Sequence, residues 1–312
     1  MRLFRKLALG ASLLALFVGA CTTGGGSSPG SSVGAGVTVK VGSVGFYESR
    51  LMAELYAQVL EANGYTVVRN LGIGTREVIA PAHEKGEVDL RPEYIGSGLG
   101  FYDNTKPTSD AAKNKQELQA ILRGKGGGIT VLGYTPGQDT NAFVVRSDTA
   151  AQFNLKKLSD VTAIAKQLKW GLPPECPTYK FCGDALRDAY GIDIATLQVT
   201  PLAPCDAPMA EALNSKAIDI AELCSTQAAI QQFGFVVLQD DKVTQPADNL
   251  APIVRNDLLA KTDKAAFSKM LDDVSAKITT EILFKLGIEV AINNKNVDDV
   301  ARTWLKEQGV VK

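Results

Sequence analysis

Apolar residues recur along the chain in two spacings, one typical of strands and one typical of helices. Residues 37–44 alternate apolar and polar side chains and predict a strand, and residues 48–63 carry apolar positions at helical spacing until Gly64. The same alternation continues with strands expected at 65–71, 88–90 and 129–134 and helices at 75–85 and 109–123. A strand–helix order of this kind predicts a mainly parallel sheet flanked by helices.

A second α/β series follows the turn-rich segment TPGQDT at 135–140. Strands are expected at 141–146, 169–172, 196–201, 218–224 and 235–238, with helices at 184–190, 208–215 and 226–232. The segment QPADNLAP (245–252) then precedes a short strand at 253–255 and helices at 264–278, 280–286 and 297–307. We therefore expect two lobes: residues 37–138 and 246–312 form lobe 1, and residues 139–245 form lobe 2. Ligands bind α/β sheets at strand carboxyl ends, so the cleft between the lobes is the expected ligand site.

The beginning of the chain has the pattern of a secretory signal over residues 1–20. A basic start is followed by an apolar run and by the small residues Gly19 and Ala20. Residues 21–36 begin with Cys21 and continue as a Gly/Ser-rich stretch, which is typical of a flexible tether. The tetrapeptide ending at Cys21 resembles a bacterial lipobox, and this predicts an extracytoplasmic lipoprotein anchored to the cell membrane through a lipid on Cys21. A cleaved signal that happens to precede a cysteine is the alternative.

Export changes the expected state of the four remaining cysteines. Outside the reducing cytosol an even number of cysteines predicts disulfides. Four cysteines allow three pairings, and the short intervening segment PTYKF favours Cys176–Cys182 as one loop staple. Cys205 and Cys224 then pair between neighbouring strand ends. An exported thiol oxidoreductase that uses Cys205 or Cys224 is an alternative from another functional class.

Composition and charge exclude several classes. The chain has 312 residues, is 45% hydrophobic and 21% charged, and is neither a polytopic membrane protein nor mostly disordered. The net charge of −1 becomes −4 when the first segment is removed with its three positive residues Arg2, Arg5 and Lys6, and neither value suits nucleic-acid binding. The single histidine, His83, excludes a multi-histidine metal site, and we expect it to be exposed or to cap a helix. No cofactor, metal or catalytic residue is expected.

Polar and aromatic residues gather where predicted strands end. They are Ser43, Tyr47, Tyr94, Ser97, Asp139, Thr140, Asn141, Ser225, Thr226, Asp248 and Asn249. Hydroxyls, amides and aromatic faces that converge on one cleft can orient a small molecule, and aromatic or carboxylate groups favour a cation. The alternative for each Ser, Thr, Asp or Asn is an ordinary helix cap.

The segments GSVGFYESRLMAELYAQVLEANGYTV and LGIGTREVIAPAHEKGEVDLRPEYIGSGL resemble the glycine betaine/choline (quaternary-amine) substrate-binding proteins of ABC transporters. PECPTYKFC, EALNSKAIDIAELCSTQAAI, VVLQDDK and QPADNLAPIVR also match, in family order over residues 38–256. The resemblance implies a type II periplasmic-binding-protein fold: a monomeric, two-lobe clamp without enzymatic activity. Such a clamp closes on an osmoprotectant and delivers it to a membrane permease driven by a cytoplasmic ATPase.

The resemblance also implies site residues. Characterised members hold a trimethylammonium group in a cage of tyrosines, because aromatic faces attract a weakly hydrated cation. Tyr94 matches one cage position, and Ser97 matches a hydroxyl that helps to bind carboxylate. The other cage positions carry Asn141, Cys224 and Asp248, and two basic residues that grip betaine's carboxylate align with Val44 and Tyr179.

These departures change the expected ligand contacts. Asp248 and Asp139 would supply countercharge, Tyr47 and Tyr179 replacement aromatic surface, and Thr226 and Asn141 hydrogen bonds. The expected solute is glycine betaine, choline or carnitine. The alternative is the same transport role for a different small cationic metabolite.

Overall fold

The computed structural model describes residues 33–203, 205 and 207–312. The predicted signal segment 1–20, the lipidation site Cys21 and most of the tether lie outside these residues. Among the described helices, none is both long enough and apolar enough to cross a membrane.

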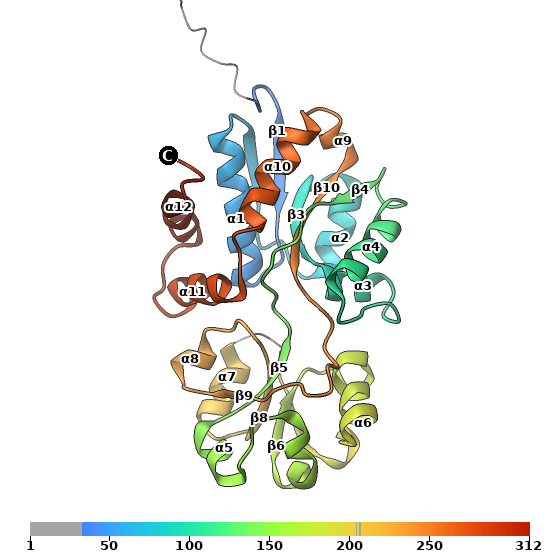
Figure 1. Cartoon of the computed structure of the whole chain (residues 1–312), viewed down its shortest axis with the longest axis vertical. Helices are drawn as coiled ribbons and strands as arrows, with labels where there is room; N and C mark the ends of the chain where they lie inside the picture. The colour runs from blue at the N-terminus through green and yellow to red at the C-terminus, as the bar shows by residue number, and fades with distance from the viewer. Residues whose placement is uncertain (1–32, 204, 206) are drawn as a thin grey trace, which may run out of the picture. The chain divides into compact units, whose positions relative to one another are not determined.

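The first sheet has the strand order β2-β1-β3-β10-β4. Its strands are β1 (Thr38–Gly42), β2 (Thr66–Asn70), β3 (Leu90–Tyr94), β4 (Ile129–Val131) and β10 (Leu250–Arg255). The helices beside it are α1 (Tyr47–Ala62), α2 (Arg76–Lys85), α3 (Ile95–Tyr102), α4 (Ala111–Leu122), α9 (Asn256–Leu259), α10 (Lys264–Ser275), α11 (Thr280–Ala291) and α12 (Val297–Glu307). We call this part lobe 1 (Figure 1).

The second sheet has the order β7-β6-β8-β5-β9, and the part around it is lobe 2. Its strands are β5 (Asn141–Val145), β6 (Lys169–Leu172), β7 (Gln198–Pro201), β8 (Ile220–Cys224) and β9 (Val236–Val237). Its α-helices are α5 (Ser147–Phe153), α6 (Ala185–Tyr190), α7 (Ala207–Asn214) and α8 (Ala229–Gln232). Short 3₁₀ helices span Leu158–Gln167, Cys176–Thr178 and Ile194–Thr196, and a π-helical turn spans Lys180–Asp184.

In each sheet four strands run in one direction, as predicted, and one strand, β10 or β5, runs antiparallel to them. The two connections between the lobes are the reason for this antiparallel strand. The chain leaves lobe 1 into β5 and returns into β10. Each of these strands enters its sheet at the edge where neighbouring strands end: Asn141 pairs with Cys224, and Leu250 pairs with Tyr94. A strand that starts at that edge must run antiparallel to its neighbour. The connections therefore pass beside the strand ends that were expected to carry the site.

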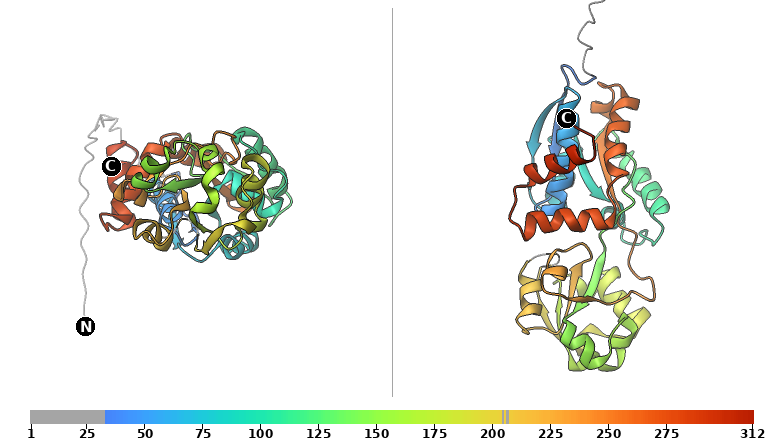
Figure 2. Two further views of the ribbon diagram at one scale, coloured as in Figure 1. Left: turned by 90° about the horizontal axis from the view of Figure 1, so that it is seen from below. Right: turned by 60° about the vertical axis from the view of Figure 1, so that its left-hand side comes forward.

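The core of lobe 1 surrounds α1. This helix buries most of its residues because it packs against the sheet and also against α10, α11 and α12 (Figure 2). The Tyr56 hydroxyl in the middle of α1 is 2.9 Å from Ser275 Oγ on α10, so the buried phenol has a partner. In lobe 2, the fully buried Trp170 donates its indole N–H to the Ala165 carbonyl at 2.9 Å.

Three helices and one burial state differ from the sequence predictions. α3, α5 and α9 were not predicted, and β3 continues through Pro92 to Tyr94, beyond the predicted end at residue 90. Pro92 lies directly opposite Pro252 of β10, so each proline faces a residue that also lacks an N–H. His83 was expected to be exposed or capping, and this was wrong: it is buried, because α2 packs this face inward toward Asp89 and Arg255.

Candidate functional site

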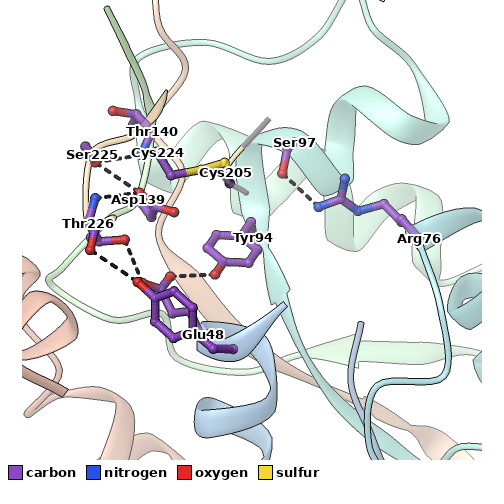
Figure 3. Close-up of a disulfide and its surroundings, with 11 residues drawn as sticks. Glu48, Arg76, Tyr94, Ser97, Asp139, Thr140, Cys205, Cys224, Ser225 and Thr226 are labelled. Atoms are coloured by element: carbon purple, nitrogen blue, oxygen red, sulfur yellow. Dashed lines mark hydrogen bonds between the residues drawn. A yellow bond between two sulfur atoms is a disulfide. The ribbon is translucent and has the colours of Figure 1, made fainter. Parts of the chain in front are cut away.

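The candidate site lies where β3 and β8 end and where α1, β5 and β10 begin. Tyr94 is the last residue of β3, and Thr226 comes two residues after β8. Glu48 is in the first turn of α1, because the chain turns directly from β1 into this helix. Side chains from both lobes meet at this point (Figure 3).

Glu48 joins the two lobes. The Tyr94 hydroxyl donates to Glu48 Oε1 at 2.5 Å from within lobe 1, and Thr226 Oγ1 of lobe 2 donates to Glu48 Oε2 at 2.7 Å. The Tyr47 hydroxyl donates to the Thr226 carbonyl at 3.3 Å, which adds a second contact between the lobes. Both oxygens of Glu48 are occupied by protein donors in this conformation.

Asp139 is a second buried acid at the same place. It accepts hydrogen bonds on Oδ1 from the Thr226 backbone N–H at 3.0 Å and from Ser225 Oγ at 3.1 Å. Thr140 and Ser225 are bonded through their backbones, with the Ser225 N–H donating to the Thr140 carbonyl at 2.8 Å. These bonds fix the segment after β8 against the segment that leads into β5.

The two acids carry unusual proton affinities. Burial, and secondly the charge of Asp139, raise the pKa of Glu48 to about 8, although hydrogen bonds from Tyr94 and Thr226 work in the opposite direction. Burial raises the pKa of Asp139 to about 6 against the hydrogen bonds from Thr226 and Ser225. A cation beside these carboxyls would stabilise their charged forms, so the cluster is suited to a positively charged group.

A positive group lies on the other side of Tyr94 in the view of Figure 3. Arg76, the first residue of α2, donates from Nη2 to Ser97 Oγ at 2.8 Å and to Glu93 Oε1 at 3.0 Å. Glu93 also accepts from Arg91 Nη1 at 2.5 Å. Burial acts to raise the pKa of Glu93, but the two arginines outweigh it and lower the pKa to about 2, so this carboxylate is charged.

Three predicted site residues form side-chain hydrogen bonds with the backbone. Asp248 accepts from the Gly96 and Ser97 N–H groups at 2.8 and 2.9 Å and so caps α3, although burial raises its pKa to about 7. Asn249 donates to the Thr135 and Gly137 carbonyls at 2.9 and 3.1 Å. Ser43 accepts from the Gly72 N–H at 2.9 Å.

The loop closed by Cys176 and Cys182 brings Tyr179 to the side of lobe 2 that faces Arg76. Burial is the main cause that raises the pKa of Tyr179 to about 12. The charge of Asp248 also raises this pKa, and the charge of Arg76 lowers it. In the same loop, Lys180 Nζ donates to the Thr105 carbonyl of lobe 1 at 3.1 Å. The loop therefore forms a second set of contacts between the lobes.

Cavities are small at the acids and larger beside them. The cavity lined by Tyr47, Glu48, Asp139 and Thr226 measures about 10 Å³, which is room for one water molecule at most. A separate cavity of about 350 Å³ is lined by Thr140, Asn141 and Ser225. In this conformation the space between Glu48 and Asp139 therefore holds nothing larger than one water molecule.

Both disulfides predicted from the sequence are present, Cys176–Cys182 and Cys205–Cys224. Within the described residues, one group of side chains has metal-ligand spacing: Cys176, Cys182 and Glu222. The two sulfurs are bonded to each other and offer no thiolate, so in this state the group does not form a thiolate metal site. Burial, and secondly the charge of Glu175, raise the pKa of Glu222 to about 8.

Sequence reasoning missed two residues of this arrangement, Glu48 and Arg76. Each lies in the first turn of a helix that follows a strand of lobe 1, Glu48 after β1 and Arg76 after β2. That position, at the sheet edge where strands end, was the available signal. The side chains were overlooked because charged residues in a first helical turn are commonplace.

Residues 37–307 match the family described as the substrate binding domain of the ABC-type glycine betaine transport system. The chain belongs to this family. The resemblance noted in the sequence is thereby confirmed, and so is the expectation that the protein is not an enzyme. Substrate-binding proteins of ABC importers work outside the cytoplasm.

Curated relatives and a solved structure extend the comparison. The chain is 29% identical to the glycine betaine-binding protein YehZ of Escherichia coli (strain K12), over 88% of this chain and 92% of that protein. It is 26% identical to the carnitine transport binding protein OpuCC of Listeria monocytogenes serotype 1/2a (strain 10403S), over 98% and 95%. The crystal structure of a glycine betaine/carnitine/choline ABC transporter protein aligns with a TM-score of 0.71 at 24% identity, over 87% of this chain and 99% of that one. This likeness confirms the two-lobe fold.

Proposed function

We propose that this substrate-binding protein captures a quaternary-amine osmoprotectant of the glycine betaine, choline and carnitine class and delivers it to a membrane permease with a cytoplasmic ATPase. The names of the relatives YehZ and OpuCC support this solute class. The observation that carries the proposal is the placement of the Tyr94 ring between the lobes beside two buried acids, Glu48 and Asp139.

The chemistry of a quaternary ammonium suits this arrangement. It has no N–H to donate, so a site recognises it through aromatic faces and nearby negative charge. Tyr94 would supply a face, and Glu48 and Asp139 would supply countercharge. Phe46, whose ring centroid is 5.8 Å from that of Tyr94, and Tyr47 add aromatic surface at the start of α1.

Capture would proceed by opening and closing of the lobes. The contacts Thr226–Glu48 and Lys180–Thr105 hold the lobes together in the present conformation. A solute shifts the equilibrium only by as much as it binds the closed state better than the open one. The solute must therefore offer more than the protein–protein hydrogen bonds that it displaces at Glu48.

The sequence-based expectations on organisation complete the proposal. Lobe 1 comprises residues 37–138 and 246–312, lobe 2 comprises residues 139–245, and the protein acts as a monomer. Residues 1–20 direct export, and a lipid on Cys21 anchors the protein to the membrane through the tether 21–36. Fractionation of cells that produce the Cys21→Ser variant tests the anchor: the protein should leave the membrane fraction, and retention there would contradict lipidation at Cys21.

A thermal-shift panel tests the solute class. Glycine betaine, carnitine and choline are compared with proline and arginine, which lack a quaternary amine. A ligand that binds the folded state raises the melting temperature with its concentration above Kd. A shift with at least one quaternary amine, and none with the other solutes at equal concentration, supports the proposal. No shift with any quaternary amine up to millimolar concentration contradicts it.

A further inference from the structure

We infer that the pair Cys176 and Cys182, once reduced, binds a thiophilic divalent cation such as Zn²⁺ together with the carboxylate of Glu222. The site lies inside lobe 2, and none of its three residues lines the cavity beside Glu48. Its ligand atoms, two sulfurs and one carboxylate oxygen, lie within 4.8 Å of one another. Soft thiolate ligands favour Zn²⁺, whereas Mg²⁺ and Ca²⁺ prefer oxygen ligands.

Glu222 is an unusual residue for its position in the fold. It lies in the middle of β8, and Ile220, two residues earlier on the same face of the strand, belongs to the apolar core of lobe 2. Glu222 is buried, and its pKa is raised by this burial and by the charge of another acid, Glu175; neither effect is offset by a cation of the described residues. An acid in an apolar core is costly unless it is protonated or coordinates a metal. A buried acid of this kind is a candidate functional group.

The two cysteines lie directly against this acid. Cys176 begins a 3₁₀ helix and Cys182 lies in the π-helical turn that follows, and both are fully buried in the same apolar core. Cys182 Sγ is 2.7 Å from Glu222 Oε2. A disulfide sulfur carries no hydrogen, so in the oxidised protein the O–H of the protonated acid is the donor in this contact. The carboxyl of Glu222 is therefore directed at sulfur rather than at a charged partner.

Reduction converts this arrangement into a set of metal ligands. A phosphine breaks the Cys176–Cys182 bond: the phosphine takes oxygen from one water molecule to become its oxide, and the two hydrogens of that water complete two thiols. Zn²⁺ then displaces both thiol protons and the Glu222 proton as two Zn–S bonds and one Zn–O bond form. Zn–S bonds of about 2.3 Å place tetrahedral sulfur ligands about 3.8 Å apart, which the present spacing within 4.8 Å allows. The metal's charge offsets most of the charge of its three ligands.

The metal would hold the same loop that the disulfide holds. Lys180 lies in this loop, between the two cysteines, and its Nζ donates to the Thr105 carbonyl of lobe 1 at 3.1 Å. Either an S–S bond or a metal ion between the sulfurs closes the loop. Zn²⁺ would therefore preserve this contact between the lobes under reducing conditions.

Binding of Co²⁺, a spectroscopic substitute for Zn²⁺, tests the inference. The Cys21→Ser protein is unfolded in urea with a phosphine, which makes the buried disulfide accessible, and is refolded by dilution without oxygen in the presence of Co²⁺. The refolded protein should show the near-ultraviolet thiolate-to-cobalt absorption band, and Zn²⁺ should abolish it by displacing Co²⁺. Glu222→Gln should weaken Co²⁺ binding at least about 10-fold, since it replaces a charged ligand with a neutral amide. Absence of the band, or equal affinity for Glu222→Gln, would overturn the inference.

Two control variants locate the metal. Cys205→Ala/Cys224→Ala removes the other disulfide and should leave the band unchanged. Glu175→Gln removes an acid that influences Glu222 through its charge but is not one of the ligands, so it should change the affinity much less than Glu222→Gln does. Loss of the band in Cys205→Ala/Cys224→Ala would place the metal at the other cysteine pair and overturn the inference.

Thermal melts of the reduced and oxidised proteins give a second readout. Zn²⁺ should raise the melting temperature of the reduced protein, because a metal that only the folded state binds stabilises that state. It should leave the oxidised protein unchanged, because the bond between Cys176 and Cys182 leaves no thiolate there. An equal shift for the oxidised protein, or a reduced chain that fails to refold even with Zn²⁺, would overturn the inference.

Discussion

Thr226 Oγ1 donates a 2.7 Å hydrogen bond to Glu48 Oε2, and this bond connects side chains 178 residues apart that belong to different lobes. The same carboxyl receives the Tyr94 hydroxyl on its other oxygen. Glu48 therefore links Tyr94 of lobe 1 to the segment after β8 in lobe 2. In this conformation its two oxygens accept hydrogen bonds from donors of both lobes.

Thr226→Val should favour the open form of the unliganded protein. The substitution keeps the side-chain shape but removes the donor to Glu48 and leaves that buried carboxyl short of one partner. Small-angle X-ray scattering should show a larger radius of gyration than for the wild type without solute. Thr162→Val is the matched control, because Thr162 Oγ1 bonds the Tyr190 carbonyl inside lobe 2. Equal radii for Thr226→Val and wild type would contradict a closing role for this bond.

The free energy of unfolding of the unliganded protein should decrease as the pH rises from 5 to 8, because Glu48 loses its proton in this range. Its pKa rises from an ordinary 4.5 to about 8 on folding, so the unfolded chain loses this proton first as pH increases. The favourable contribution of the protonated carboxyl is complete below about pH 4.5 and is lost as pH approaches 8. Glu93, whose pKa is lowered to about 2, changes stability only at more acidic pH.

Thermal melts across this pH range measure the effect as a difference between variants. Glu48→Gln should flatten the decrease, since the amide does not titrate, whereas Glu117→Gln at the half-exposed ion pair with Lys106 should leave it unchanged. The comparison with wild type removes the contribution of other groups such as buried His83. A pH profile of Glu48→Gln that is parallel to wild type would contradict the raised pKa.

Tyr94 should contribute to affinity mainly through its ring. Tyr94→Ala removes a cation–π contact of about 1–2 kcal/mol, so binding of glycine betaine should weaken about 5-fold to 30-fold in calorimetry. Tyr94→Phe keeps the ring and loses only the donor to Glu48, so its loss should be smaller. Phe101→Ala, at an exposed aromatic residue of α3, is the control. If Tyr94→Ala and Tyr94→Phe bind as wild type does, the solute does not contact this ring.

The disulfide Cys205–Cys224 should stabilise the protein more than Cys176–Cys182 by the loop-closure argument. The bridges close loops with sequence separations of 19 and 6, which correspond to about 3 and about 2 kcal/mol in the chain-entropy estimate. Urea unfolding of the Cys205→Ala/Cys224→Ala double variant should show a free energy of unfolding lower by about 3 kcal/mol. In this double variant a reducing agent acts only on the remaining bridge, Cys176–Cys182. An unchanged free energy of unfolding for the double variant would contradict a stabilising role for the bridge Cys205–Cys224.

The sequence predicted much of the fold because strand and helix spacings are local signals. The missed helix α3 shows the limit of this reasoning. Its sequence IGSGLGFY contains three glycines, which disfavour helices, and its cap Asp248 lies 152 residues away from Gly96. A cap supplied by a distant segment leaves no local pattern to read.

The site shows the same division between local and distant information. Tyr94, Asp139 and Thr226 were among the predicted residues, because each lies close to the end or the beginning of a predicted strand and the family resemblance marked Tyr94. Glu48 and Arg76 were not, since their partners Thr226 and Ser97 are brought to them only by the tertiary fold. Asn249 lay at the predicted place, but its amide turns back to the carbonyls of 135 and 137.

A crystal structure of the protein with glycine betaine tests the central claim most directly. The trimethylammonium group should lie against the Tyr94 ring and beside Glu48 and Asp139, with the Thr226–Glu48 hydrogen bond displaced or lengthened. Glycine betaine in the cavity lined by Thr140 and Asn141, with the Thr226–Glu48 contact intact, would contradict this account of the site.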